Sequence, residues 1–306
     1  MKLSYFIKNI DAWQPLIAAR DIKREPFMAH LENIRAQFGR MAEKPENQID
    51  LVEGALLIAR TAFPDLIASH CTDQLDRWAE GLQERCGPSS SAGDILSGLN
   101  RILFEKEGFR GDIHTYYDPQ NSFLNRVLER KLGIPITLSL VYSEVGRRAG
   151  FPLHGIALPG HFITGLFHAS GTLYIDPFNQ GEILSEKECR EMIEGRFGRE
   201  TADHAAWKAP AGKKAILKRM LRNLKAIYRQ IGQDMQVFEM IHWILVLDPD
   251  APAELRERAL LYETMGHNAF AVRDFEHYLE VEPSSEDRDV IALKISQLKS
   301  SGRWLH

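Results

Sequence analysis

The sequence predicts an α+β fold in three parts. A helical N-terminal region (residues 1–107) precedes a core in which a buried helix packs on a small antiparallel sheet (residues 108–200), and α-helical repeats follow (residues 213–300). Three observations lead to this prediction: apolar residues recur at helical spacing through most of residues 28–106, short strand-like segments lie between residues 153 and 175, and the last third repeats itself.

The N-terminal region has the signals of consecutive helices. Asp50 followed by Glu53 forms a capping pair, because the carboxylate of Asp50 can accept hydrogen bonds from free N–H groups of the first turn. A helix is therefore expected to begin near residue 51 and to end before Pro64. Residues 86–93 are small, polar and rich in Gly, Pro and Ser, which predicts a surface loop before the next helix.

Two helices are expected at the start of the core, at residues 122–131 and 135–149. The second is apolar on most sides, which is typical of a buried helix, and Pro135 is acceptable in a first turn. Asn121 or Ser122 is expected to cap the first helix. The alternative for these two residues is that they line a pocket.

Strand-like segments at residues 153–158, 162–167 and 172–175 are separated by Gly-containing turns, which predicts an antiparallel sheet on the buried helix. Ser185 and Glu188 repeat the capping pattern and open another helix. Residues 194–210 are polar and predict a linker.

The last third of the chain repeats itself at a constant spacing. The pairs that align are Leu221 with Leu255, Ile227 with Leu261, Tyr228 with Tyr262, Gly232 with Gly266, Leu245 with Leu279, and Pro249 with Pro283. This spacing is the period of the tetratricopeptide repeat, in which Gly is expected to let two helices approach and Pro to end the second helix. Two such units are too few to bury their apolar faces against each other, so we expect them to pack against the preceding domain.

The core contains four distinctive sequence motifs: residues 117–124 (YDPQNSFL), 133–140 (GIPITLSL), 158–162 (LPGHF) and 174–178 (YIDPF). In order and spacing they resemble the SirB-type branch of the transglutaminase-like, papain-related superfamily, whose members carry C-terminal tetratricopeptide repeats. The resemblance covers residues 45–290. It implies a transglutaminase-like fold for the core.

The resemblance also implies a catalytic constellation. Active members use a Cys at the start of the buried helix as nucleophile, a His as its base, and an Asp that orients the His. These last two positions fall on His161 and Asp176, but the helix start falls on Pro135, Ile136 and Thr137, and none of these is Cys. The nucleophile of the family is therefore missing.

Thr137 and Ser139 are the hydroxyls near that helix start. A hydroxyl has a far higher pKa than a thiol, and Thr or Ser in a first helical turn more often bonds to nearby backbone. His161 and Asp176 in turn have a structural alternative, a polar pair that joins two adjacent strands. Tyr117, with Tyr116 and Tyr174, is interpreted either as a packing residue or as part of a binding site with Asn121, Ser122 and Ser139.

The composition argues against several classes of partner and cofactor. The net charge is −4 and the sequence pI is near 6.3, so we expect neither nucleic acid nor a membrane surface as a partner. Residues 213–222 form a basic helix, interpreted as a solvated face or as a site for acidic partners. Three cysteines without CxxC spacing predict no disulfide framework and no zinc site, and no cofactor is expected. Absence of a signal peptide or membrane span predicts a cytoplasmic protein.

Two functions are compatible with these features. The first is an intracellular interaction or regulatory protein, in which the repeats hold a protein or peptide partner and the transglutaminase-like site is degenerate. The second is a hydrolase or acyltransferase on amide or peptide bonds that uses a substituted nucleophile, Thr137, with His161 and Asp176. The missing Cys favours the first, and the oligomeric state stays open.

Overall fold

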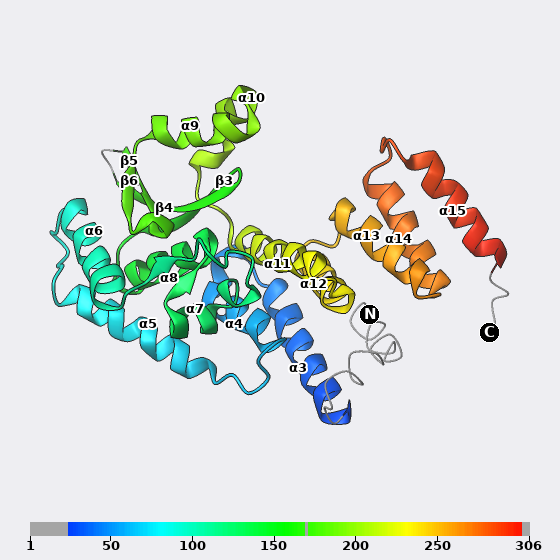
Figure 1. The fold of residues 1–306 in the computed structure, drawn as a ribbon, viewed down its shortest axis with the longest axis horizontal. Coiled ribbons are helices and arrows are strands. Elements are labelled where there is room, and N and C mark those ends of the chain that lie inside the picture. Colours follow the sequence, from blue (N-terminus) through cyan, green and yellow to red (C-terminus); the bar gives the residue numbers. More distant parts are fainter. Residues whose placement is uncertain (1–23, 169–170, 302–306) are drawn as a thin grey trace. The chain divides into compact units, whose positions relative to one another are not determined.

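The computed structural model describes residues 24–168 and 171–301, and the chain divides into two compact units (Figure 1). We call Lys44–Met220 the core unit. The second, the repeat unit, combines Met1–Glu43 with Leu221–His306. The fold is α+β, as the sequence predicts, with helices at the N-terminus of the core unit, a small antiparallel sheet and helical repeats.

The core unit begins with helices α4 (Leu51–Arg60), α5 (Ala68–Gln83) and α6 (Ala92–Asn100), and a π-helical segment (Arg101–Lys106) continues α6. The predicted start of α4 is confirmed, because the Asp50 carboxylate accepts a hydrogen bond from the Glu53 N–H at 3.0 Å. The predicted loop separates α5 from α6, and Ser91 opens α6 through a capping box with Asp94.

Helix α7 (Leu124–Arg130) ends where Lys131 adopts a left-handed backbone with φ of 60°. The predicted capping by Asn121 or Ser122 is wrong, since α7 begins after Phe123 without a side-chain cap. Asn121 instead ends a short 3-10 helix (Pro119–Asn121) that the side chain of Asp118 caps. The capping residue of this segment is therefore Asp118, at the start of the preceding turn.

Helix α8 (Pro135–Arg148) is confirmed as the buried helix of the core unit. The sheet that packs on it has the order β3 (Leu153–Leu158), β4 (His161–His168), β5 (Gly171–Asp176) and β6 (Glu182–Leu184), all antiparallel. Strand β6 was not predicted, because so short a strand does not show an alternating pattern. A second pair, β1 (Arg110–Gly111) and β2 (Leu132–Gly133), is parallel.

The two faces of the four-stranded sheet are covered by different helices (Figure 1). Helix α8 packs against β3 and β4 on one face, where the Thr164 hydroxyl donates to the Ser139 carbonyl at 3.4 Å. On the other face lies an apolar cluster shared with helix α9 (Glu186–Phe197), which begins at the predicted capping box of Ser185 and Glu188. The sheet therefore separates α8 from α9.

The prediction of a linker over residues 194–210 is wrong. This segment contains the end of α9, helix α10 (Arg199–Asp203) and a 3-10 helix (Ala205–Lys208). Ala202 and Trp207 are buried in the cluster on the α9 face, and the Trp207 indole N–H donates to the Ala202 carbonyl at 3.2 Å. Two buried side chains among polar ones leave too weak a pattern to be recognised in the sequence.

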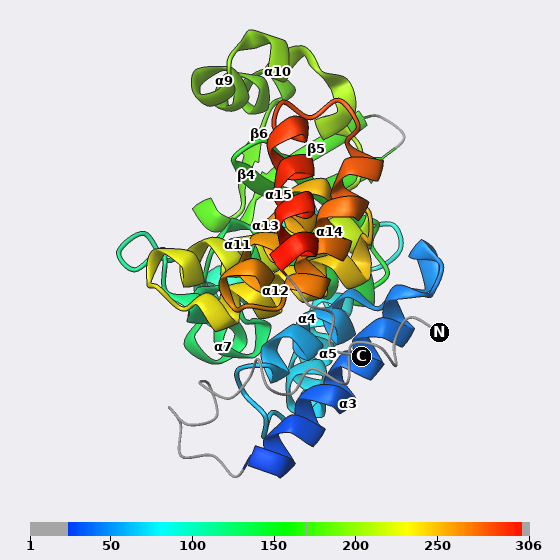
Figure 2. The same cartoon turned by 90° about the vertical axis from the view of Figure 1, so that its right-hand side faces the viewer.

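The repeat unit contains the last part of α11 (Lys213–Gln230), then α12 (Asp234–Leu247), α13 (Pro252–Thr264), α14 (Asn268–Val281) and α15 (Arg288–Ser301). Helices α13, α14 and α15 lie side by side (Figure 2). Helices α12 and α14 begin one repeat period apart and end one repeat period apart, as the alignment of the sequence predicts.

The glycines of the repeat have a different reason from the predicted one. Gly232 and Gly266 have φ of 70° and 76°, and a Cβ atom at either position would meet nothing within 4 Å. They are therefore required for a left-handed backbone at the end of a helix, where Gly avoids steric strain, and not for close approach of two helices.

An N-terminal helix adds to the repeat unit. Helix α3 (Arg24–Ala42) packs against α12, where Phe38 and Trp243 have ring centroids 4.3 Å apart. Arg35 Nε donates to Glu239 Oε1 at 3.2 Å, and the Trp243 indole N–H donates to the same carboxylate. Since two repeats bury their faces incompletely, α3 supplies part of the missing cover.

His242 gives the repeat unit a specific acid sensitivity. Burial, reinforced by the charges of Arg35 and Arg258, lowers the pKa of His242 well below its usual value. Its folded-state pKa lies below its unfolded value of about 6.5, so the unfolded chain binds the additional proton and stability falls as the pH drops below about 6.5. Intrinsic amide exchange slows as the pH falls in this range, so we expect the protection of α12 amides, expressed relative to the intrinsic exchange rate, to decrease between pH 7.5 and 5.5.

The matched variant for this prediction is His242→Gln, measured by hydrogen exchange of α12 with mass spectrometry. In this variant the protection of α12 amides is expected to depend less on pH. An unchanged pH dependence would show that another group is responsible for the acid sensitivity.

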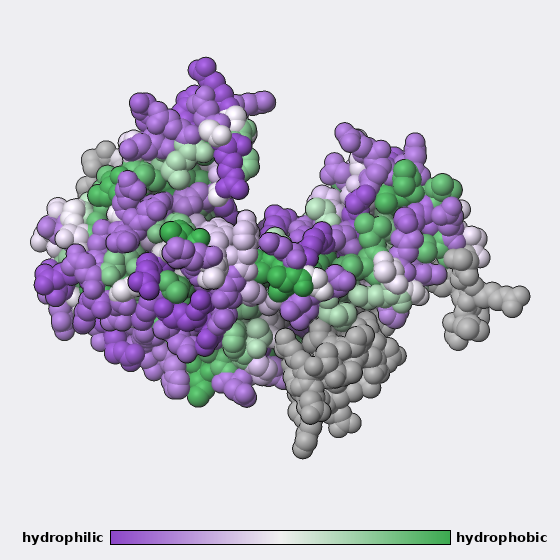
Figure 3. Space-filling view, viewed as in Figure 1, coloured by the Kyte–Doolittle hydropathy of each residue, from purple (hydrophilic) through white to green (hydrophobic). Residues whose placement is uncertain are grey.

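The visible surface is mostly hydrophilic, with hydrophobic side chains in small separate areas (Figure 3). Within residues 24–168 and 171–301, none of the helices combines the length and the apolar character needed to cross a membrane. On such a surface, a group of adjoining large apolar side chains indicates a candidate binding site.

Candidate functional site

A tight turn and a strand end bring His161 and Asp176 together. Leu158 and His161 are paired across the hairpin of β3 and β4, and Gly160 in the turn has φ of 72°. Asp176 is the last residue of β5, directly opposite Ile163 in the strand register that Thr164 and Ile175 define. His161 and Asp176 are therefore diagonal neighbours on one face of the sheet.

The pair is joined by a short hydrogen bond. His161 Nε2 and Asp176 Oδ2 are 2.7 Å apart. Asp176 also accepts hydrogen bonds from the Phe178 N–H at 3.0 Å and the Asn179 side-chain amide at 2.9 Å. The Asp176 side chain is 1% exposed and that of His161 is 16% exposed, so the carboxylate is fixed and one edge of the imidazole remains near solvent.

The pair lies on the face of the sheet that α9 covers. Cross-strand partners share a face, and Leu158, the partner of His161, belongs to the cluster that contains Cys189 and Ile193 of α9. At the turn, a Cβ atom on Gly160 would approach Phe197 to 2.6 Å. The environment of the pair is thus built by β4, β5 and the end of α9.

The two candidate hydroxyls belong to α8, which packs on the opposite face. Thr137 is 0% exposed, and its hydroxyl donates to the Asn121 carbonyl at 2.8 Å while it accepts from the Ile134 N–H at 3.1 Å. Ser139 is also 0% exposed and donates to the Phe162 carbonyl at 3.2 Å. Both hydroxyls are thereby committed to backbone groups.

Cysteine does not replace the missing nucleophile. Cys71, Cys86 and Cys189 are all buried and free. Cys189 lies on α9, where burial first, and then the charges of Asp176 and Glu188, raise the pKa of its thiol to about 12. Burial also raises the pKa of Cys71. A thiol with a raised pKa is a poor nucleophile because the thiolate is the reactive form.

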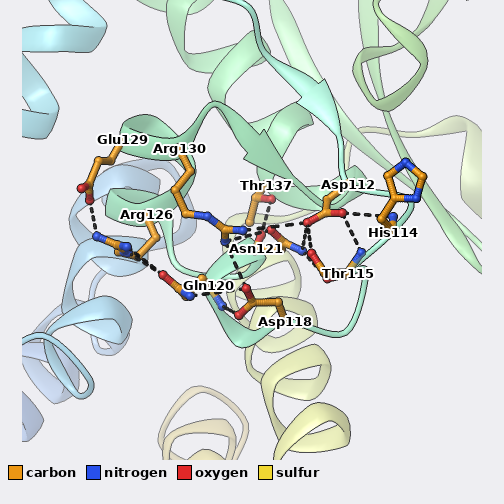
Figure 4. A network of polar contacts seen from close by, with 10 residues as sticks. All are labelled: Asp112, His114, Thr115, Asp118, Gln120, Asn121, Arg126, Glu129, Arg130 and Thr137. Carbon is orange, nitrogen blue, oxygen red and sulfur yellow. Dashed lines mark hydrogen bonds and ion pairs between the residues drawn. The ribbon is translucent and has the colours of Figure 1, made fainter.

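A buried polar network fixes the loop that precedes α7 (Figure 4). Asp112 accepts hydrogen bonds from the His114 N–H at 3.1 Å and from the Thr115 N–H at 2.8 Å through one oxygen. Its other oxygen accepts from the Thr115 hydroxyl and from the Asn121 side-chain amide at 3.1 Å. This side chain therefore closes the loop on itself.

The network continues into two helices. Asn121 accepts a hydrogen bond from Arg130 of α7 at 3.2 Å through its side-chain oxygen, and its carbonyl accepts from Thr137 of α8. Burial raises the pKa of Asp112, but its hydrogen bonds with Thr115, Asn121 and His114 outweigh this and lower the pKa to about 2. The carboxylate is therefore ionised near neutral pH and holds the loop through charged hydrogen bonds.

The predicted binding residues divide by exposure. Asn121 and Ser122 are 0% and 1% exposed, and the Ser122 hydroxyl has no hydrogen-bond partner within the described part of the chain. Tyr117 is 62% exposed, so its interpretation as a packing residue is wrong, whereas Tyr174 is buried. Whether Asn121, Ser122, Ser139 and Tyr117 bind a ligand stays a prediction.

Two further residues of the site were missed. Asp112 has a local signal, since an Asp shortly before Thr115 is typical of an Asx turn. Arg219 gives none, because it comes from α11 and donates to the Leu158 carbonyl at 2.9 Å and the His161 carbonyl at 2.7 Å. Such a distant brace of the turn is visible only in three dimensions.

The site holds no evident set of metal ligands. Over the described ranges of the chain, no three His, Cys, Asp or Glu side chains gather in a way that could hold a metal ion. The chemistry available at the turn is that of one oriented imidazole beside a fixed carboxylate.

Several basic side chains of α11 are bonded to groups of their own unit. In the core unit, Lys213 donates to the Ile49 carbonyl at 2.5 Å, and burial lowers the pKa of Arg219. In the repeat unit, Arg222 and Lys225 are paired with Glu254 at 3.0 and 3.1 Å. Each of these side chains bonds to a group within its own unit.

Comparison with known proteins agrees with this architecture. A family described as the transglutaminase-like superfamily matches residues 69–222, which is half of the chain. The chain belongs to the transglutaminase-like superfamily. A tetratricopeptide repeat family matches residues 224–295, so the transglutaminase-like domain is followed by the predicted repeats. The narrower SirB-type assignment and the three predicted domain boundaries stay predictions.

Relatives match the transglutaminase-like chain over most of its length. A UPF0162 protein of Xylella fastidiosa (strain Temecula1) is 37% identical over 254 residues, which are 82% of this chain and 90% of the relative. The UPF0162 protein YchA of Escherichia coli is 23% identical over 87% of this chain and 99% of the relative. Human F-box only protein 21 is 28% identical over 77% of this chain and 41% of that protein. No solved structure matches the chain.

Proposed function

We propose that the chain is a protein-interaction or regulatory protein whose transglutaminase-like domain is degenerate as an enzyme. One observation carries the proposal most directly: the residues at the start of α8 include no Cys, and the two hydroxyls there are buried and hydrogen-bonded to backbone. A nucleophile must be free to reach its base and its substrate. Repeats of this kind present extended surfaces for protein segments, which supports the interaction role.

The retained His161–Asp176 pair then acts as a structural element. Its short hydrogen bond joins β4 to β5 next to the turn that Arg219 braces. A hydrolase or acyltransferase that uses Thr137 is the competing function, because the same pair could orient a general base. That function requires the Thr137 hydroxyl to leave two backbone partners, which costs about 1 kcal/mol for each hydrogen bond.

Turnover distinguishes the two functions. We expect the full chain to release no ammonia from glutamine-containing proteins, to incorporate no amine label, and to cleave no fluorogenic peptide amide above the buffer rate. His161→Ala is expected to leave these readings unchanged. Turnover that is lost in His161→Ala and kept in His154→Ala, a variant of another histidine in the same sheet, would establish the enzyme instead.

The interaction role has a separate measurement. A photo-crosslinking amino acid placed at Val290 or Leu293, which are 63% and 60% exposed on α15, is expected to capture the same protein from the native cells at both positions. Purified, that protein should bind the chain in calorimetry. A set of products no different from those of a crosslinker at Ile67 of the core unit would contradict the role of the repeats.

A further inference from the structure

Aromatic side chains gather beside His161. We call Tyr116, Tyr117, Phe178 and Phe197 the aromatic patch. Tyr116 lies 5.3 Å from Tyr117 and 6.2 Å from Phe178 between ring centroids, and Phe178 meets the His161 ring edge to face at 6.3 Å. Phe197 lies against the Gly160 turn on the same side. Loop, turn and helix end thus each contribute an aromatic side chain near His161 or the turn before it.

This surface is exposed to an unusual degree for its composition. Tyr117 is 62% exposed, Phe197 45% and Tyr116 37%. Isolated exposed apolar side chains are normal, but exposed aromatic side chains that adjoin one another are typical of binding sites. Tyrosine is favoured in such sites because it offers a large contact area for the ordering of few rotatable bonds.

Two arginines lie beside the aromatic patch, although the chain as a whole is acidic. Burial raises the pKa of Tyr116, and the charged groups that act on it besides Tyr117 are the guanidinium groups of Arg219 and Arg196, which lower it. Arg196 stacks near Phe197 at 5.6 Å and, among the described residues, makes no ion pair. Asp176, the nearest carboxylate to His161, is buried and already bonded.

The loop that carries Tyr116 and Tyr117 is ordered before any partner arrives. Asp112 and Asn121 hold its two ends through buried hydrogen bonds (Figure 4). Ordering side chains and loops is a main cost of association, so a loop that is already fixed binds more tightly for the same contacts. This gives the polar network a consequence for binding as well as for stability.

From these contacts we infer that the aromatic patch with Arg196 docks an acidic segment of a partner protein, one that carries a large apolar side chain. A carboxylate of the segment meets Arg196, and the apolar side chain lies on Tyr117, Tyr116 and Phe197. The inference rests on the proposed interaction role and adds a second surface to it, in the core unit. The charge favours acidic over basic segments, and the aromatic rings require more than charge alone.

A peptide array tests the inference with the full chain. Three classes of short peptides each carry one Phe, Tyr, Trp or Leu among residues that are acidic, basic or uncharged. We expect the chain to bind acidic peptides, and the strongest of these, labelled with fluorescein, to give saturable anisotropy that weakens with added salt. Binding by the basic class, or by none, would overturn the inference.

Variants locate the binding. Arg196→Glu and Tyr117→Ala are each expected to weaken the labelled peptide about tenfold, which corresponds to the loss of one strong interface contact. The matched controls Arg77→Glu and Ile67→Ala, both on exposed positions of the core unit, are expected to stay within twofold of the unchanged chain. Equal losses in controls and test variants would contradict the assigned surface.

Two additional arms separate this inference from others. A labelled single-stranded DNA that binds with the same dependence on Arg196 would replace the acidic protein segment by nucleic acid as the partner. Capture of a protein by α15 with no peptide binding to the core unit would leave the proposed function in place and remove only the second surface. Turnover by the chain would contradict the proposed function without bearing on the peptide.

Discussion

Arg258→Leu is expected to destabilise the repeat unit by about 3–5 kcal/mol, because it leaves a buried carboxylate without its cation. Arg258 of α13 and Asp274 of α14 are 6% and 8% exposed at their side chains. They form two parallel hydrogen bonds, at 2.6 Å from Nε and 2.8 Å from Nη2. Asp274→Met is expected to cost a similar amount, since it strands the guanidinium group instead.

The repeat itself supplies the rescue. The equivalent positions of the preceding repeat, one period earlier in the chain, are Leu224 and Met240, and both are buried and apolar. The double variant Arg258→Leu with Asp274→Met therefore places at these two positions the residue types that the preceding repeat carries. Replacing a buried ion pair by apolar residues of similar volume is often neutral or stabilising, so we expect most of the lost stability to return.

Urea unfolding followed by pulsed hydrogen exchange of α12, α13 and α14 measures the free energy of this unit directly. Exchange in α4 and α5 of the core unit serves as the internal control. A double variant no more stable than the single ones would show that the geometry at this crossing demands the ion pair. A negligible effect of Arg258→Leu would show that water reaches Asp274.

The parts of the fold predicted best were those with a periodic or capped pattern. Helix α8 and the strands that follow it were predicted from apolar runs and from Gly turns, and the capping box at Ser185 placed the start of α9. The period of the last third was interpreted correctly as a repeat, but the role of Gly232 was not. A sequence shows that Gly is required and does not show whether space or backbone conformation requires it.

The site was predicted only in part, for a related reason. The His161–Asp176 pair followed from the resemblance, and its hydrogen bond is present. The commitment of Thr137 to the Asn121 carbonyl was not foreseeable, because it depends on a loop that folds back on α8. The aromatic patch was equally hidden, since Tyr117 and Phe197 are far apart in the sequence and exposure has no local signature.

Asp112→Asn is expected to cost the core unit about 2 kcal/mol at pH 7, because hydrogen bonds to a buried charged group are worth about 1.5–3 kcal/mol. The amide side chain keeps the shape of Asp112 but loses the charge that faces Arg130 and one acceptor for Asn121 and Thr115. Asp118→Asn, in the same loop but more exposed, is the matched control and should cost less.

The effect of Asp112 depends on pH with a definite sign. Its folded-state pKa of about 2 lies below the ordinary pKa of 3.8, so the native state binds fewer protons than the unfolded chain in this range. The stabilisation is present above about pH 4 and disappears as the pH falls through 2. The difference in unfolding free energy between the unchanged chain and Asp112→Asn should therefore shrink from pH 5 to pH 2.

Hydrogen exchange of residues 112–121 shows whether the hydrogen bonds of Asp112 that stabilise the core unit also keep the loop ordered. If Asp112→Asn exchanges faster there and binds the acidic peptide more weakly, while Asp118→Asn does neither, the network fixes the aromatic side chains for binding. If exchange accelerates with no change in peptide affinity, the fixed loop matters for stability alone, because the binding surface then forms equally well from a mobile one.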